Sequence, residues 1–216
     1  MKKFAFVSDF DGTLTDKDFY WIIIDKYLKE SGKELYRQWK EKKMPDVEFL
    51  GAVFESINRT EPEILDDILS IPFDKYAKEF IEKIKKAGGD FIILSAGTSY
   101  YIEILLQHEK IDGITIISNK GIYKNRGVFM LPDKASPYYS EIYGVDKALV
   151  VKELKNKYEE IFYAGDSAPD FKASLLADTV FAKSKLQDML KEEGHPFIGF
   201  NNFSQVENYL TKIGVI

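Results

Sequence analysis

The chain has 216 residues, of which 45% are hydrophobic and 14% aromatic, so it is long and apolar enough to bury a substantial core. Its 35 acidic and 30 basic residues give a formal net charge of −5 without a basic block, and this balance predicts no nucleic-acid partner. The chain has no cysteine for a disulfide or thiolate, and its apolar runs are far shorter than the ~20 residues of a membrane span, so we expect a cytoplasmic protein without a membrane partner.

The first predicted element is a buried strand, Phe4–Val7, that leads into the sequence DFDGTLT of residues 9–15. Because alternate residues of a strand point the same way, Asp9 and Asp11 are expected to face one spot. Two adjacent carboxylates repel each other and persist where a cation, a shared proton or chemistry compensates. The alternative is a strand that simply ends in polar turn residues.

The next stretch, residues 16–74, contains no strand-like run and shows only helical periodicity. The expected helices are Phe19–Lys29, Lys33–Lys43, Val47–Asn58 and one that begins after Thr60, with Pro62 and Glu63 in its first turn. This stretch is too long for an ordinary crossover. We therefore expect residues 16–74 to form a small helical cap domain, and residues 1–15 and 75–216 to form a core domain.

The rest of the chain alternates between short apolar runs and amphipathic segments. The further apolar runs are Phe91–Leu94, Ile114–Ile117, Ile161–Ala164 and Thr179–Ala182. Their hydrophobicity is continuous, which is typical of strands buried on both faces of a parallel sheet. The amphipathic segments predict helices at Tyr76–Ala87, at Lys147–Tyr158, and from a capping box of Ser204 and Glu207 to about Ile213. This alternation predicts an α/β fold with an open, Rossmann-like parallel sheet.

One segment, Asn119–Tyr143, breaks this alternation. It holds two glycines and two prolines and has no helical period. It is expected to form a hairpin or a long loop, and loops of this length are usually functional or mobile.

Polar residues follow three of the predicted strands. Ligands of open α/β sheets bind just outside the carboxyl ends of the strands, so these residues are expected to meet at one edge. The residues at the three strand ends are Asp9 and Asp11, then Ser95, Ala96 and Gly97, then Asp166 and Asp170.

A lysine adds a fourth candidate. Lys147 follows Asp146, an expected N-cap, and so falls in the first turn of a helix. A cation there opposes the helix dipole by roughly 0.3–1 kcal/mol. That cost is understandable if Lys147 and the helix N-terminus together hold an anion, whereas a solvated surface lysine is the alternative.

In order and spacing, these residues resemble the four motifs of the haloacid-dehalogenase (HAD) superfamily of phosphatases. The helical insert directly after the first motif resembles that superfamily's C1 cap, and the resemblance covers essentially the whole chain. Within the superfamily the chain is similar to the phosphoserine-phosphatase branch, subfamily IB. Its GDS motif and the segment 119–143 look closer still to the methionine-salvage hydroxyketo-methylthiopentenyl phosphate phosphatases.

The resemblance implies a Mg²⁺-dependent phosphomonoesterase that acts on a small phosphorylated metabolite. Asp9 is the implied nucleophile, which forms an aspartyl-phosphate, and Asp11 is the implied general acid and base. The implied metal ligands are Asp9, the backbone carbonyl of Asp11, and Asp166, supported by Asp170. The implied phosphate-binding residues are Gly12, Ser95, Ala96, Gly97 and Lys147.

The chain departs from the phosphoserine branch in two places. Ala96 stands where that branch usually has glycine, and no cap arginine matches its substrate motif. Asp18 lies near the expected acidic cap position, and we take Asp18 and Tyr20 as the candidates for substrate specificity. The alternatives are a phosphoserine phosphatase or related phosphotransferase, and, in another class, a non-catalytic phosphate-binding protein with the HAD fold.

The sequence leaves open the physiological substrate, the oligomeric state and whether the cap or the segment 119–143 selects the substrate. Aromatic residues near the motifs offer little further guidance. Phe19, Tyr20 and Trp21, near the base of the cap, could face the substrate, but packing in the helical core is favoured. Burial in the core is also favoured for Tyr100 and Tyr101, although one of the two could line the pocket.

Overall fold

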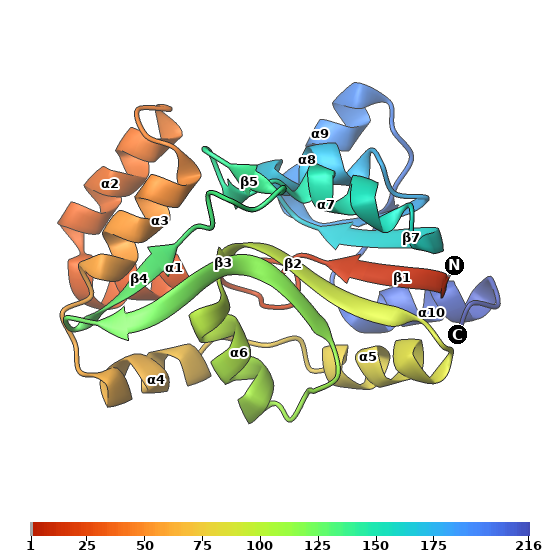
Figure 1. Cartoon of the computed structure of the whole chain (residues 1–216), viewed down its shortest axis with the longest axis horizontal. Helices are drawn as coiled ribbons and strands as arrows, with labels where there is room; N and C mark the ends of the chain where they lie inside the picture. Colours follow the sequence, from red (N-terminus) through yellow and green to blue (C-terminus); the bar gives the residue numbers. More distant parts are fainter. Residues whose placement is uncertain (1) are drawn as a thin grey trace.

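A seven-stranded sheet runs through the molecule, with helices on both of its faces (Figure 1). The computed structural model describes residues 2–216. Its strands are β1 Lys2–Ser8, β2 Asp90–Thr98, β3 Thr115–Lys124, β4 Gly127–Leu131, β5 Tyr139–Ser140, β6 Gly144–Val145, β7 Tyr158–Gly165, β8 Thr179–Ala182 and β9 Ile198–Gly199. Its helices are α1 Phe19–Ile23, the π-helical η1 Ile24–Leu28, α2 Glu30–Lys40, α3 Asp46–Glu55, α4 Glu61–Leu69, α5 Ala77–Lys86, α6 Ser99–His108, α7 Lys147–Leu154, α8 Ala168–Ser174, α9 Ser184–Glu193 and α10 Phe203–Lys212.

The sheet has the order β4-β3-β2-β1-β7-β8-β9, and neighbouring strands are parallel except for the pair β3 and β4. All five apolar runs of the sequence fall on its strands, with Ile114 directly before β3, so the predicted Rossmann-like parallel sheet is confirmed. From the central strand β1 the chain passes to β2 on one side and later returns to β7 on the other. This reversal creates a switch point at the carboxyl end of β1.

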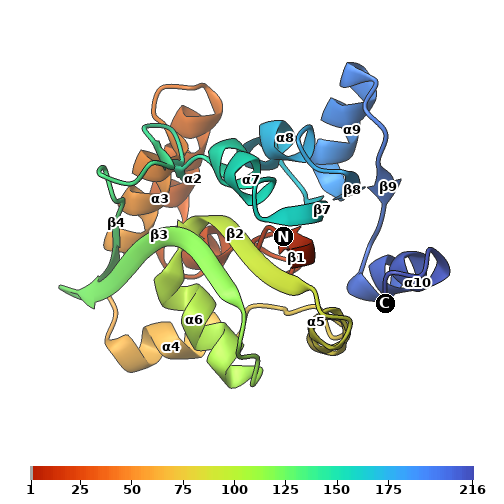
Figure 2. The ribbon, with the colours of Figure 1, turned by 45° about the vertical axis from the view of Figure 1, so that its right-hand side comes forward.

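Alternate residues of β1 feed two separate cores, because both faces of the sheet are covered. Phe6 points to the face of α5 and α10, where its ring lies 4.9 Å from that of Phe80 and 6.2 Å from that of Phe203. Ala5 and Val7 point to the opposite face, which α7 and α8 cover (Figures 1 and 2). Continuous rather than alternating hydrophobicity is what such a doubly covered strand requires.

The insert after β1 is helical, as predicted, and consists of α1, η1, α2, α3 and α4. Helices α2 and α3 stand beyond the carboxyl ends of the central strands, while α4 lies against α6 (Figure 1). Thr60 and Glu63 form a capping box at the start of α4, with Pro62 in its first turn. In the described part of the chain, no helix combines the length and apolarity that a membrane span needs.

The chain enters and leaves the insert side by side. Thr15 and Phe73 form an antiparallel bridge. The Asp16 N–H donates to the carbonyl of Pro72, and the Asp74 N–H donates to that of Leu14, both at 2.9 Å. The two connections therefore behave as one short paired ribbon.

The segment Asn119–Tyr143 forms both a hairpin and a loop. Strands β3 and β4 are joined through Asn125 and Arg126, whose positive φ values of 49° and 65° suit a two-residue hairpin turn. The loop 132–143 follows, and the short pair β5 and β6 closes it.

The hairpin also holds the end of α3. A side chain at Gly127 would place Cβ 2.6 Å from the carbonyl oxygen of Glu55, so the two backbones need glycine there. The Arg59 N–H donates to the carbonyl of Arg126, and the Arg126 side chain donates to Asn58 Oδ1, each at 2.9 Å. The insert is thus attached to the core at a third place.

The predicted cap of the last helix is wrong. Helix α10 begins at Phe203, and its N-cap is Asn202, whose side chain accepts the N–H of Ser204 at 3.2 Å. Glu207 bonds Lys83 at 2.6 Å across the interface with α5 instead of closing a capping box. Asn202 is as good an N-cap as serine, and it lies where the chain turns into the helix.

Candidate active site

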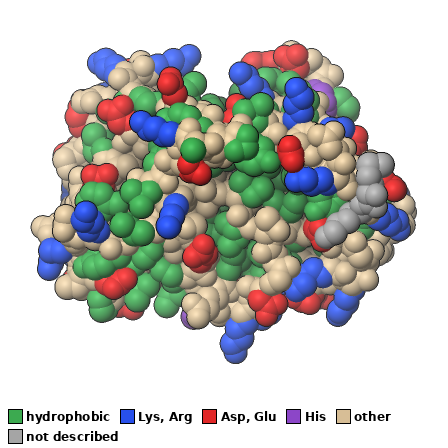
Figure 3. Space-filling model, in the orientation of Figure 1, with side chains coloured by type: hydrophobic (Ala, Val, Ile, Leu, Met, Phe, Trp, Pro, Cys, Tyr) green, Lys and Arg blue, Asp and Glu red, His purple; other side chains and the backbone are tan. Residues whose placement is uncertain are grey.

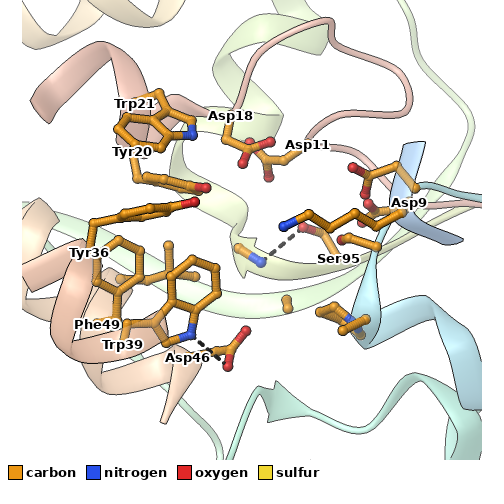
Figure 4. A pocket seen from close by; sticks show the side chains of 18 of the residues that line it. Asp9, Asp11, Asp18, Tyr20, Trp21, Tyr36, Trp39, Asp46, Phe49 and Ser95 are labelled. Atoms are coloured by element: carbon orange, nitrogen blue, oxygen red, sulfur yellow. Dashed lines mark hydrogen bonds between the residues drawn. The ribbon is translucent and has the colours of Figure 1, made fainter. Parts of the chain in front are cut away.

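The carboxyl ends of β1, β2 and β7 bring the predicted polar residues to one cavity of about 310 Å³ (Figure 4). Asp9 and Asp11 enter from the end of β1, Ser95 from β2 and Asp166 from β7. In the space-filling view an indentation separates the lobe of α2 and α3 from the lobe of α7, α8 and α9 (Figure 3). The three motifs therefore meet at the switch point of the sheet.

Asp9, Asp11, Ser95 and Asp166 form one end of the cavity, which we call its polar end, and Lys147 lies among them. Its ammonium group donates to Asp9 Oδ1 at 2.5 Å and to Asp170 Oδ1 at 2.7 Å. Only 3% of the residue is exposed, so the alternative of a solvated surface lysine is wrong. Burial opposes the charge of Lys147, but the charges of Asp170 and Asp9 outweigh it and raise its pKa.

Asp170 holds the loop that carries Asp166. Besides the lysine, Asp170 Oδ1 accepts the hydroxyl of Tyr163 at 2.7 Å. Its Oδ2 accepts the backbone N–H groups of Asp166 and Ser167 at 3.1 and 3.2 Å. This carboxylate is fully buried, and its contacts fix the start of α8.

The carboxylates of this end fit a divalent cation. Carboxylate oxygens of Asp9, Asp166 and Asp170 lie within 4.8 Å of one another, and the ammonium group of Lys147 pairs with two of these three carboxylates, those of Asp9 and Asp170. Asp166 Oδ1 is buried without a hydrogen-bond partner. Burial and the charge of Asp170 raise the pKa of Asp166 to about 7, and the same two causes raise the pKa of Asp9. A hard cation with oxygen ligands, such as Mg²⁺, would relieve this repulsion.

Asp11 has a different environment from Asp9. Its Oδ2 accepts the hydroxyl of Tyr101 at 2.5 Å, and its Oδ1 accepts the backbone N–H of Phe19 at 3.3 Å. Burial and the charge of Asp18 raise the pKa of Asp11 to about 7. A carboxyl group with such a pKa can both give and take a proton near neutral pH.

The predicted phosphate-binding residues take up two kinds of position. Ser95, Ala96 and Gly97 line the cavity, and the Ser95 hydroxyl accepts the N–H of Gly97 at 2.9 Å (Figure 4). Gly12 instead lies against Asp166, where an added Cβ would be 2.6 Å from Oδ2. Its φ of +77° and this contact both require glycine.

The other end of the cavity has an aromatic wall supplied by the insert. Asp18 and Tyr20, the predicted specificity residues, line it, and burial raises the pKa of Asp18. The rings of Trp39 and Phe49 stack at 4.7 Å, and the Trp39 indole donates to Asp46 Oδ1 at 2.9 Å (Figure 4). The other aromatic residues of this wall are Trp21, Tyr36 and Phe54.

The sequence model of the family described as haloacid dehalogenase-like hydrolase matches residues 6–174, which include every carboxylate of the polar end and Lys147. The chain belongs to this family. The resemblance on which the motifs were assigned is therefore confirmed.

Several known proteins are similar to this chain over nearly its whole length. It is 27% identical over 212 residues to a 2-hydroxy-3-keto-5-methylthiopentenyl-1-phosphate phosphatase of Microcystis aeruginosa (strain NIES-843 / IAM M-2473), covering 97% of this chain and 98% of the relative. It is 24% identical over 215 residues to the phosphatase of the same name from Brevibacillus brevis (strain 47 / JCM 6285 / NBRC 100599), covering 98% and 97%. Its fold is similar to that of a phosphoserine phosphatase from T. onnurineus, with a TM-score of 0.68, 18% identity and coverage of 97% and 94%. The expected HAD fold with a helical cap is thus confirmed.

Sequence reasoning missed part of this HAD site. Trp21 packs against the core, as favoured, but it is only half-buried and also lines the cavity. No motif in the sequence marks Tyr36, Trp39 or Asp46 as residues of the site. The spacing of Tyr36 and Trp39, three residues apart on one helix, could have suggested a shared face, but it does not say whether that face meets a core or a cavity.

Lys147→Met is expected to lower the free energy of unfolding by about 3–5 kcal/mol in the presence of chelator, because Asp9 and Asp170 lose the ammonium group they share. Denaturant unfolding followed by circular dichroism measures the change. Lys155→Met is the control, since Lys155 pairs with Asp178 at 2.9 Å with both side chains well exposed, and its loss should be below ~1 kcal/mol. Equal losses in the two variants would contradict the shared buried pair.

Proposed function

We propose that this HAD-family chain is a Mg²⁺-dependent phosphomonoesterase that hydrolyses a small phosphorylated metabolite through an aspartyl-phosphate intermediate. The observation that carries the proposal is the separation of two carboxylates in one cavity. Asp9 shares Lys147 with Asp170, whereas Asp11 is bonded apart from them to Tyr101. Once a bound cation offsets the burial and repulsion that raise the pKa of Asp9, these environments let Asp9 stay ionised as a nucleophile while Asp11 carries a proton. The phosphatases among the similar proteins support the same reaction.

In the proposed reaction, a carboxylate oxygen of Asp9 attacks phosphorus as the bond from phosphorus to the leaving oxygen breaks. Asp11 gives its proton to that oxygen. Asp11 then takes a proton from the water that attacks phosphorus, which releases inorganic phosphate and regenerates Asp9. Lys147 and Ser95 lie in the same cavity and offset the charge of the phosphoryl oxygens.

Mg²⁺ is the proposed cofactor, with Asp9, Asp166 and the backbone carbonyl of Asp11 as its protein ligands and Asp170 as support. When bound, it neutralises part of the negative charge that opposes attack by a carboxylate on a phosphate. The unpartnered Oδ1 of Asp166 and the oxygen-only donor set support this assignment.

We also propose that the division into a core of residues 1–15 and 75–216 and a cap of residues 16–74 is a functional one. The paired connections at Thr15 and Phe73 support these boundaries. The metal and phosphate candidates belong to the core, whereas the aromatic wall belongs to the cap. The cap is therefore the proposed source of substrate specificity, ahead of the loop 132–143.

The cap end of the cavity favours a leaving alcohol without a carboxylate. Two carboxylates, Asp18 and Asp46, line that end together with a single cap cation, Lys40, whose ammonium group lies 4.0 Å from the centre of the Trp39 ring, and no arginine of the described chain lines the cavity. The named substrate of the M. aeruginosa and B. brevis relatives carries hydroxyl, keto and methylthio groups. A thioether packs well against aromatic rings, so this compound is our first candidate substrate, and phosphoserine is the second.

Phosphoserine is accordingly expected to be a poor substrate, with a kcat/KM at least ~100-fold below that of 2-hydroxy-3-keto-5-methylthiopentenyl-1-phosphate. Its carboxylate would have to approach two carboxylates, Asp18 and Asp46, with Lys40 as the one cap cation of the described chain that lines the cavity. An excess of like charge in a partly buried site is costly. Release of inorganic phosphate measures both rates. Equal kcat/KM values for the two substrates would show that the cap does not select against a carboxylate in the leaving group.

Hydrolysis of 4-nitrophenyl phosphate with and without Mg²⁺ tests the proposed function itself. A phosphomonoesterase of this kind releases nitrophenolate only with the metal. Tight phosphate binding without any turnover would instead support the non-catalytic alternative.

A further inference from the structure

A tyrosine hydroxyl is hydrogen-bonded to Asp11, the candidate general acid. The Tyr101 hydroxyl donates to Asp11 Oδ2 at 2.5 Å, and only 1% of Tyr101 is exposed. The residue lies in the first turn of α6, which follows directly from the second motif. The expectation of a buried core ring is therefore correct, but the polar end of that ring contacts the proposed chemistry.

The residues around Tyr101 fix the position of its hydroxyl group beside Asp11. A Cβ at Gly97 would lie 1.8 Å from it, so this glycine makes the room that Tyr101 occupies. The Tyr101 ring packs between core and cap, with centroids 6.0 Å from Phe10, 5.1 Å from Phe19 and 5.9 Å from Phe54. Three ring contacts fix the angle at which the phenol meets the carboxyl group.

We propose that Tyr101 is the positioning residue of Asp11, an inference that rests on the proposed function. The phenol bond to Oδ2 is much shorter, at 2.5 Å, than the backbone N–H contact of Oδ1, at 3.3 Å, so Oδ1 has the freer lone pairs and carries the proton that Asp11 transfers. Oδ1 also accepts the backbone N–H of Phe19, the first residue of the cap helix α1. The carboxyl group is thus held by the core through Tyr101 and by the cap through Phe19.

The variant Tyr101→Phe tests this inference, because it removes one oxygen atom and keeps the ring contacts. With an alkyl phosphate such as glycerol 3-phosphate, whose leaving group needs a proton, kcat should fall about 10- to 100-fold with little change in KM. With 4-nitrophenyl phosphate, whose leaving group needs none, rapid-quench formation of phosphoenzyme should change less than ~2-fold. Hydrolysis of that phosphoenzyme should slow, since Asp11 must act as the base, and the nitrophenolate burst should approach one per enzyme.

Tyr100→Phe is the matched control. Tyr100 precedes Tyr101 on the same helix, and its hydroxyl bonds Glu61 at 3.1 Å, away from Asp11. This variant should match the parent enzyme with both substrates. Melting temperatures of the two variants show whether either has lost its fold.

Two results would overturn the inference. One is a Tyr101→Phe enzyme whose alkyl and aryl phosphate kinetics equal those of the parent. The other is an equal loss in phosphoenzyme formation with both substrates, which would indicate a general structural role. Tyr101→Phe should also have no added effect in an Asp11→Asn background. If the parent protein hydrolyses neither substrate, the proposed function fails instead, and the two failures are therefore distinguishable.

Discussion

Asp9→Asn is expected to lower kcat for 4-nitrophenyl phosphate by at least ~10⁴-fold while the chain remains folded. The amide has nearly the shape of the carboxylate, but it cannot attack phosphorus, and no other carboxylate replaces a missing nucleophile. Nitrophenolate release at saturating Mg²⁺ measures the rate. Mass spectrometry of the acid-quenched protein should find phosphate on the parent enzyme and none on the variant.

The fold of Asp9→Asn should survive, because Lys147 keeps its bond to Asp170 and the Asp9 backbone N–H still donates to Ala164. The exposed Asp16 provides a control, since Asp16→Asn makes the same chemical change outside the cavity and should retain full activity. Residual turnover above about 1% in Asp9→Asn would refute the proposed nucleophile.

Removal of divalent cations is expected to reduce activity at least ~10³-fold, and Mg²⁺ should restore it better than Ca²⁺. Mg²⁺ imposes a tight octahedral geometry, whereas Ca²⁺ accepts looser and longer contacts that suit an in-line displacement poorly.

Asp166→Ala should weaken the apparent Mg²⁺ affinity by roughly 10- to 100-fold. It should cost little stability, because Asp166 Oδ1 has no hydrogen-bond partner and because burial and the charge of Asp170 disfavour the ionised carboxylate, as its raised pKa indicates. Titration of activity with Mg²⁺ measures the affinity.

Asp188→Ala serves as the comparison for Asp166→Ala. Asp188 is an exposed carboxylate on α9, far more accessible than Asp166, and its removal should leave the Mg²⁺ titration unchanged. Full activity in excess chelator would contradict the metal assignment. So would identical titrations for the parent enzyme and Asp166→Ala.

The sequence predicted the sheet better than its edges. Runs such as Phe91–Leu94 are apolar at every position, and in a chain of this size that pattern has few explanations besides a strand covered on both sides. Strand β9, with two residues, carries no such signal, and Asn202 was overlooked as a cap because serine two residues later offered an equally good pattern. Local chemistry permits both caps, and the packing of Phe203 against Phe80 selects the first.

At the site, the sequence predicted the charged groups but few of their neighbours. Asp9, Asp11 and Asp166 follow strands that meet at one edge, so topology alone brings them together. Tyr101 and Trp39 reach the cavity from helices, and a helix presents several faces among which aromatic spacing does not choose. The contact of Tyr101 with Asp11 joins residues 90 positions apart, which no local pattern encodes.

The attachment of the insert at several places changes how a substrate can reach the cavity. Besides the paired connections and the hairpin, the Val47 N–H at the start of α3 donates to the carbonyl of Ile142 at 2.9 Å. A cap that is joined to the core only by its two paired connections can move as one rigid body. Here the hairpin turn at Arg126 also binds the chain just after α3, so this cap, which acts as a lid, is held at both ends. Exchange of substrate for product then calls for bending inside the lid. The described chain has an irregular joint there, the π-helical turn Ile24–Leu28 followed by Lys29 at a φ of 51°. A lid that flexes in its middle while its rim stays fastened can uncover the aromatic wall without releasing the end of α3.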